Sequence, residues 1–147
     1  MRLNWNKTPC WFLQKAAFFG ASMLGIILSG EAIASCWRVG EFAGFSARSD
    51  SSYRTEPDGF GARVFLLTVS DVASSIRMEK GQSFEGIRCL KLNSFSILCI
   101  GGTDEAVSSE TWSVDVSQSR AFHTKTISGY GPFDGGNLFI GRVLGRC

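Results

Sequence analysis

His123 is the only histidine in the 147-residue chain, so any chemistry that needs an imidazole base depends on it. Such a base activates a serine, threonine or cysteine and is oriented by a carboxylate behind it. Asp115 lies on the strand that we expect beside His123. A turn over Ser117–Ser119 would bring Asp115 closer to Phe122, so we interpret His123 as a residue on the face of a sheet. A small hydrolase that uses His123 is the least favoured hypothesis.

The other residue types that carry chemistry match no catalytic motif. Asp104 and Glu105 are adjacent in a turn, where their side chains point apart into solvent. The glycine-rich stretches at 101–102 and 129–136 lack the Lys-Ser/Thr pair and the following helix of a phosphate-binding loop. With one histidine and no carboxylate cluster, a metal site has little support. We therefore predict no catalytic residue, no metal site and no cofactor.

Four of the five cysteines follow the N-terminal segment, and this number predicts two disulfides in an exported domain. We expect the pairs Cys89–Cys99 and Cys36–Cys147. A three-residue loop over 93–95 would set Cys89 directly opposite Cys99, at a distance that a disulfide can bridge. A two-residue Asn-Ser turn would instead place Arg88 opposite Cys99. No Cys-x-x-Cys spacing indicates a redox or metal site.

The stretch Ser128–Gly136 is the part of the chain that we favour for binding. It places Tyr130, Phe133 and Asp134 among glycines, and an exposed aromatic pair on an adaptable loop is typical of binding surfaces. The alternative is that both rings fold back and close one end of a barrel.

The first 34 residues have the pattern of a secretory signal peptide. Basic residues precede a thirteen-residue apolar run, Ala16–Leu28, which is short for a membrane span, and Ala32-Ile33-Ala34 follows as a cleavage pattern. An uncleaved membrane anchor is the alternative. The sequence Ile33-Ala34-Ser35-Cys36 also resembles the lipobox of bacterial lipoproteins, which implies a possible lipid anchor at Cys36. Lipidation would leave three cysteines, so we favour export without a lipid.

Charge argues against nucleic acid as a partner. The formal net charge is +2, but three basic residues and one acidic residue lie in the first 34 positions. The remaining 113 residues hold twelve of each sign without a basic run. Phosphate binding needs a clustered positive field, which this balance does not provide.

Short apolar stretches separated by turns predict a single mainly β domain over residues 35–147. We expect an antiparallel β-barrel or sandwich of six to eight short strands. The polar segment 47–61 predicts a mobile loop, and 70–81 fits either a short helix or a strand. The expected strands cover residues 37–45 (an edge strand), 63–69, 84–92, 95–100, 111–116, 120–127 and 138–144.

Size, export signal, β-structure and disulfides together are broadly similar to those of the small periplasmic inhibitor barrels, such as the c-type lysozyme inhibitors. The similarity is one of architecture and implies a periplasmic or secreted domain that binds a protein or a cell-envelope component without catalysis. The alternatives are a structural or stress-related envelope protein without a ligand, and the hydrolase that would use His123.

Overall fold

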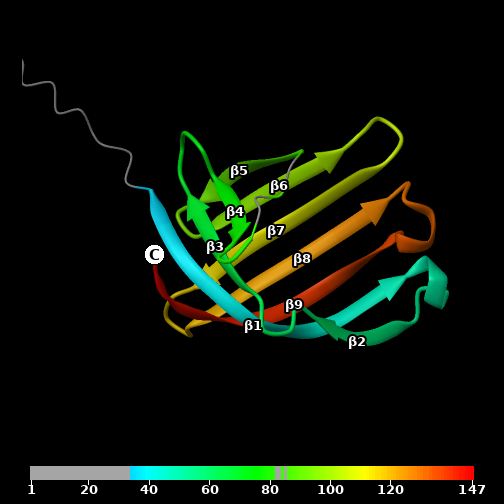
Figure 1. Ribbon diagram of the computed structural model, residues 1–147, viewed down its shortest axis with the longest axis horizontal. Coiled ribbons are helices and arrows are strands. Elements are labelled where there is room, and N and C mark those ends of the chain that lie inside the picture. Colours follow the sequence, from blue (N-terminus) through cyan, green and yellow to red (C-terminus); the bar gives the residue numbers. More distant parts are fainter. Residues whose placement is uncertain (1–33, 82–83, 85) are drawn as a thin grey trace, which may run out of the picture. The chain divides into compact units, whose positions relative to one another are not determined.

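The computed structural model describes residues 34–81, 84 and 86–147 (Figure 1). Residues 1–33 of the expected signal peptide lie outside the described residues. Within the described part of the chain, no helix is both long enough and apolar enough to cross a bilayer.

The described residues form nine strands in one antiparallel sheet that curves into a nearly closed barrel, which confirms the predicted fold class. The strand order is β4-β3-β1-β9-β8-β7-β6-β5, and β2 pairs with β1 outside this path. Two single-turn 3₁₀ helices, η1 and η2, lie in the connections. The elements are β1 (Ser35–Arg48), η1 (Ser49–Ser51), β2 (Thr55–Gly59), β3 (Val64–Val69), β4 (Ser75–Met78), β5 (Ile87–Asn93), β6 (Ser96–Gly102), β7 (Val107–Asp115), β8 (Arg120–Ser128), η2 (Gly131–Phe133) and β9 (Gly135–Arg146).

Strand β1 is central, so the prediction of an edge strand over 37–45 is wrong. One side of β1 pairs with β9 along most of its length. The other side pairs first with β3 and then with β2. The register shifts between Gly40 and Ala43, where Glu41 has a φ of 56°, and such a β-bulge bends a strand. Because β1 bends here, β3 and β2 can follow the same edge in turn.

The prediction of a loop over 47–61 is wrong at residues 55–59, because β2 pairs residue by residue with β1, from Ala43↔Gly59 to Ala47↔Thr55. Residues 49–54 do form a connection between the two strands. Backbone hydrogen bonds do not require apolar side chains, so a polar segment can join a sheet at its edge. Pro57 is tolerated there because an edge strand leaves one side of its backbone unpaired.

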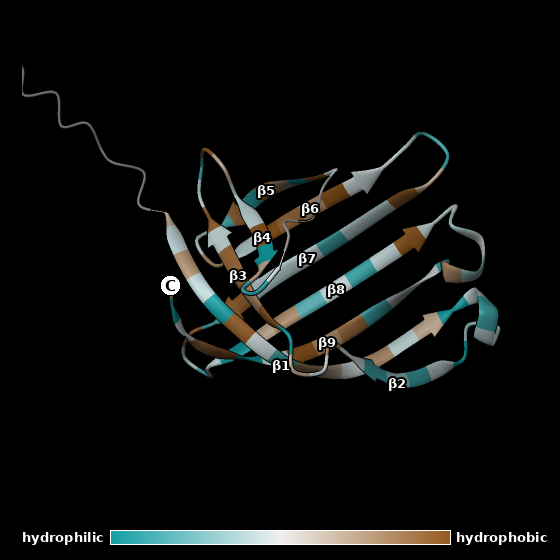
Figure 2. Ribbon diagram, in the orientation of Figure 1, coloured by the Kyte–Doolittle hydropathy of each residue, from teal (hydrophilic) through white to brown (hydrophobic). Residues whose placement is uncertain are grey.

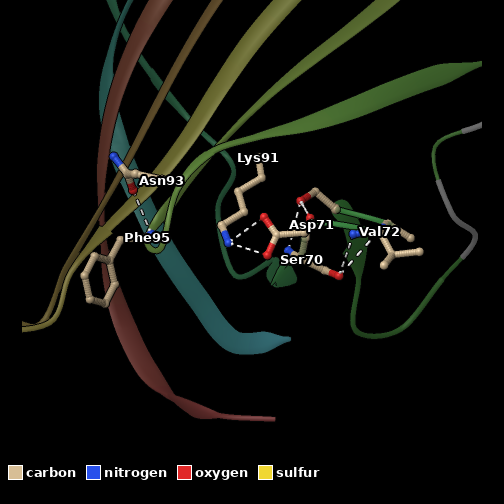
Figure 3. A network of polar contacts seen from close by, with 8 residues as sticks. Ser70, Asp71, Val72, Lys91, Asn93 and Phe95 are labelled. Carbon is tan, nitrogen blue, oxygen red and sulfur yellow. Dashed lines mark hydrogen bonds and ion pairs between the residues drawn. The ribbon is translucent and has the colours of Figure 1, made fainter. Parts of the chain in front are cut away.

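The barrel closes imperfectly between β4 and β5. Segment 70–81, for which we predicted either a short helix or a strand, contains β4. The strand prediction is therefore confirmed. One bridge, Ser74↔Cys89, joins the two sides. Figure 3 shows the nearby ion pair, in which Lys91 Nζ lies 2.8 and 2.9 Å from the two carboxylate oxygens of Asp71.

Both predicted disulfides are present. Cys89 lies directly opposite Cys99 and is bonded to it. The connection before β6 differs from the expected three-residue loop, because Asn93 pairs with Ser96 and the turn consists of Ser94 and Phe95. A register shift between Lys91 and Asn93 keeps Cys89 opposite Cys99. The Phe95 N–H donates to Asn93 Oδ1 at 2.8 Å (Figure 3). Cys36 and Cys147 join the two ends of the described chain, with their Cα atoms 5.3 Å apart.

Side chains alternate between the inner and outer faces of the sheet, and Figure 2 shows the resulting bands of polar and apolar residues along the strands. The inner face has two parts. In the covered half, β3 and β4 fold over it and enclose the core, which includes Trp37, Val39, Leu67 and Ile76. In the open half, β7, β8, β9 and β1 continue beyond β3 and β4, towards the loops that hold η1 and η2 (Figure 1).

Candidate functional site

Two neighbouring rows of inward-facing residues mark the boundary between the covered half and the open half. The aromatic row runs across three strands as Trp112, His123 and Phe139, which are opposite one another in register. The polar row lies one inward position further along the same three strands, where it consists of Glu110, Lys125 and Asn137, and it continues onto β1 as Ser46. The inner face therefore changes from apolar to polar within two residues on each strand.

A cavity of about 320 Å³ lies at this boundary. Its walls are mainly apolar and carry three charged side chains. Mainly apolar pockets with a few placed polar groups, in the mouths of β-barrels among other places, are typical ligand sites. The described residues that line it are Phe60, Arg63, Phe65, Met78, Phe84, Ile87, Glu110, Trp112 and Lys125.

The aromatic wall is built by long-range contacts. Phe60 follows β2 and stacks on Trp112 with ring centroids 5.9 Å apart and planes 15° apart. Phe65 on β3 lies at 5.1 Å from Trp112 and at 6.4 Å from Phe84, measured between ring centroids. These rings come from four separate segments of the chain, so the cavity exists only in the folded barrel.

Glu110 and His123 form a buried polar pair. Their Oε2 and Nε2 atoms are 3.1 Å apart, and both side chains are inside the barrel. Burial by itself would raise the pKa of Glu110. The hydrogen bond from His123 and the positive charge of Lys125 outweigh burial and hold the pKa of this carboxyl below its usual value. The Trp112 indole lowers the pKa slightly further, although its N–H has no hydrogen-bond partner among the described residues. Glu110 is therefore a carboxylate at neutral pH.

His123 has no surroundings that suit a catalytic base. Its side chain is 0% exposed, and its ring contacts aromatic rings on several sides, with Trp112 at 4.1 Å between centroids. Its Nδ1 atom has no hydrogen-bond partner among the described residues. Since Nε2 faces the carboxylate, no nucleophile within the described ranges hydrogen bonds to this imidazole.

Asp115 is not opposite His123, which agrees with the expectation that Asp115 lies closer to Phe122 than to His123. Asp115 lies opposite Arg120, whereas Phe122 lies opposite Ser113. The Asp115 carboxylate accepts hydrogen bonds from the Ser117 hydroxyl at 2.6 Å and the Gln118 N–H at 3.1 Å, which lower its pKa. Its role is to stabilise the turn between β7 and β8.

Lys125 and Arg63 place positive charge at the cavity. Lys125 Nζ is 3.8 Å from Glu110 Oε2, which is too long for a hydrogen bond, and its side chain is 27% exposed. Arg63 is exposed, and its guanidinium has no hydrogen bond or ion pair within the part of the chain that the structure describes. The N–H donors of both side chains are therefore available to a ligand.

The predicted binding residues lie at the rim of the open half, outside the aromatic cavity. Tyr130 is 42% exposed and Phe133 is 61% exposed, so the alternative in which both rings close the barrel is wrong. Asp134 Oδ1 accepts the Tyr130 N–H at 2.6 Å and thereby closes the loop. Phe133 borders a second hollow that Lys125 also lines, which connects this loop to the polar row.

Sequence reasoning missed Glu110 and did not assign Lys125 to a site. A signal for both is present in the alternation of the strands. Glu110 has the same parity as the inward-facing Trp112 and Val114, and Lys125 has the same parity as His123. Extending the strand predicted over 111–116 by one residue would have placed the Glu110 carboxylate inside the barrel. The alternation of the strand predicted over 120–127 already places the Lys125 ammonium group there. Within the described residues, no group of three metal-ligating side chains comes together.

Fold and site together define a class in physical terms: a small disulfide-linked β-barrel with an aromatic cavity and a charged row at its open half. Comparisons of the chain with models of protein families, with curated proteins and with solved structures give no match. Arguments about function therefore depend on the geometry of this site.

Proposed function

We propose that this protein is an exported, non-catalytic binding module whose ligand occupies the cavity between the covered half and the open half. The observation that carries this proposal is the cavity itself, which combines aromatic walls with charged side chains whose hydrogen-bonding capacity is not used up. Interiors of small domains are otherwise closely packed, so an aromatic hollow of this size is a feature to be explained.

Two features support export. The signal-peptide pattern of the first 34 residues predicts it, and the two disulfides are typical of proteins that fold in an oxidising compartment. A ligand of the cell envelope or its surroundings suits a protein in that location. The concave site favours a component small enough to enter the barrel over a flat protein surface.

The absence of catalysis is supported by the state of His123. A general base must reach the proton that it removes, and the His123 ring is enclosed by aromatic rings and held by Glu110. The exposed loop with Tyr130 and Phe133 borders the open half and would contact whatever part of the ligand protrudes from the cavity.

Thermal unfolding tests this proposal, because a ligand that binds only the folded state raises the midpoint temperature. The protein is screened against small aliphatic and aromatic acids, alcohols and amines, and against a hydrophobic extract of host cell envelopes. Met78→Trp fills the cavity with a larger side chain. Leu90→Trp adds the same ring at a position that is already 53% exposed and serves as the matched control.

We expect at least one addition to stabilise the wild type and the Leu90→Trp variant but not the Met78→Trp variant. If no addition stabilises the wild type, or if Met78→Trp responds equally, the cavity is not a ligand site. A structural envelope protein without a ligand would then be the better account.

A further inference from the structure

We infer that the ligand of this cavity is a small amphipathic anion, with its apolar body against the aromatic wall and its acidic group beside Lys125 and Arg63. This inference rests on the proposed binding function and adds the chemical class of the ligand. It follows from three properties of the site: its size, its apolar surface and its balance of charge.

The size of the cavity limits the ligand. A volume of about 320 Å³ is at the lower end of the range for small-molecule pockets, which extends to roughly 1,000 Å³. A cavity of that size has room for a compound with one ring, or with a short alkyl chain, and a polar group. A folded protein segment or a long acyl chain does not fit inside.

The apolar body would contact the rings of Phe60, Phe65 and Trp112. The stacked pair Phe60–Trp112 presents an aromatic surface, and Met78 and Ile87 complete the apolar lining. Removing an alkyl chain or ring from water into such surroundings contributes roughly 25 cal/mol per Å² of apolar surface buried. This term favours binding but does not distinguish one head group from another.

Charge distinguishes the head group. Among the described lining residues, two side chains are positive and one is negative. The negative one, Glu110, is already engaged by the His123 Nε2–H at 3.1 Å and by the charge of Lys125. A cationic ligand would compete with Lys125 for that carboxylate and would meet Arg63 as well.

An anionic group, in contrast, would use donors that no described residue engages. Lys125 has three N–H donors, and the nearest carboxylate oxygen among the described residues is beyond hydrogen-bond distance. Arg63 presents a planar fork that matches a carboxylate. Glu110 then has a positioning role, because its charge draws Lys125 towards the boundary between the aromatic and polar rows.

Matched ligands that differ only in the head group test this inference. Octanoate, octanol and octylamine form one set, and 3-phenylpropanoate, 3-phenylpropanol and 3-phenylpropylamine form the other. Isothermal titration calorimetry at neutral pH measures their affinities for the oxidised wild-type protein. We expect the carboxylate of at least one set to bind about tenfold or more tightly than its alcohol and amine, as charge-assisted hydrogen bonds predict.

Variants locate the head group. Lys125→Gln and Arg63→Gln should each weaken carboxylate binding about tenfold while leaving alcohol binding unchanged. Arg88→Gln is the control, because Arg88 is exposed on β5 and does not line the cavity. Each variant is first compared with the wild type by thermal unfolding. Higher salt should weaken carboxylate binding in the wild type more than alcohol binding.

The outcomes separate this inference from the proposed function. If the alcohol binds as tightly as the carboxylate, the head-group assignment is wrong and the cavity remains a binding site. If the amine binds most tightly, Glu110 is the recognition group and the assignment is reversed. If none of the six compounds binds, the inference is wrong, and the Met78→Trp screen shows independently whether the cavity binds another class of ligand.

Discussion

The covered half and the open half of the barrel are built from the same strands, yet they have different inward-facing residues. On β7 the inward position changes from Trp112 in the covered half to Glu110 in the open half. On β8 and β9 the matching changes are from His123 to Lys125 and from Phe139 to Asn137. The alternation of the strands is the same throughout. What differs is whether β3 and β4 cover the inner face.

This difference separates stability from function within one sheet. The covered half contains the closely packed core, and burial of its apolar side chains provides most of the driving force for folding. The open half keeps charged side chains at the edge of that core, where low solvent access strengthens their interactions. A cavity at the boundary can use both properties, because apolar burial and charge recognition meet there.

The largest expected effect is on the covered half, through its disulfide. Replacing Cys36 and Cys147 together by alanine should lower the free energy of unfolding by about 4–5 kcal/mol, because this bond links residues 111 apart in sequence. Replacing Cys89 and Cys99 together, which are 10 residues apart, should cost about 3 kcal/mol. Urea unfolding of both double variants measures the two costs.

The order of these two costs tests the chain-entropy argument. A larger loss for the hairpin disulfide would mean that closure of the barrel at the β4–β5 seam matters more than linking the chain ends. Ligand affinity provides a second comparison. The Cys36–Cys147 bond lies away from the cavity, so its loss should not change the affinity for the best ligand at temperatures where the variant is folded.

A smaller effect is expected from the charge of Glu110 at the boundary. Glu110→Gln should lower the free energy of unfolding by about 1–2 kcal/mol at pH 7, because it removes the charge from a buried hydrogen bond. Since the pKa of Glu110 is lower in the folded state, this stabilisation is fully present above the unfolded pKa. It disappears as the pH falls through the folded pKa. The difference in free energy of unfolding between the variant and the wild type, measured by urea unfolding from pH 7 to pH 3, should therefore decrease as the pH falls.

If the difference in free energy of unfolding is constant over this pH range, the carboxylate charge is not the source of the stabilisation. The variant would then act through the shape of the amide alone. Glu110→Gln should also weaken binding of the anionic ligand indirectly, since Lys125 would lose the charge that draws it towards the cavity.

Local patterns in the sequence were sufficient to predict the two strands of the hairpin and the disulfide between them. The Cys89–Cys99 pair depends on the turn at Ser94-Phe95 and on the register shift at Leu92. Asn93 supports that turn with its own side chain, so the register is determined within a few residues. Regular alternation placed Trp112 and Val114 on the inner face in the same way. In each case the physical cause lies within one or two neighbouring strands.

The cavity could not be predicted because its parts are distant in sequence. Phe60 and Arg63 both lie in the connection between β2 and β3. They reach Glu110 only when the bulge in β1 directs β3 over the sheet. The β2 strand itself was missed because its residues are polar. Its pairing with β1 depends on backbone hydrogen bonds and on the ion pair between Arg48 and Asp58. No periodic pattern within a short stretch of the sequence indicates the cavity or strand β2.

The smallest expected effect concerns the rim loop of the open half. Tyr130→Ala and Phe133→Ala should each change the free energy of unfolding by less than about 0.5 kcal/mol, because both rings are largely exposed. Asp134→Ala should cost about 1 kcal/mol, since it removes the acceptor of the Tyr130 N–H. If the rim contacts the ligand, the aromatic variants weaken binding without loss of stability, whereas a stability loss above about 2 kcal/mol in either would show that the rings belong to the core after all.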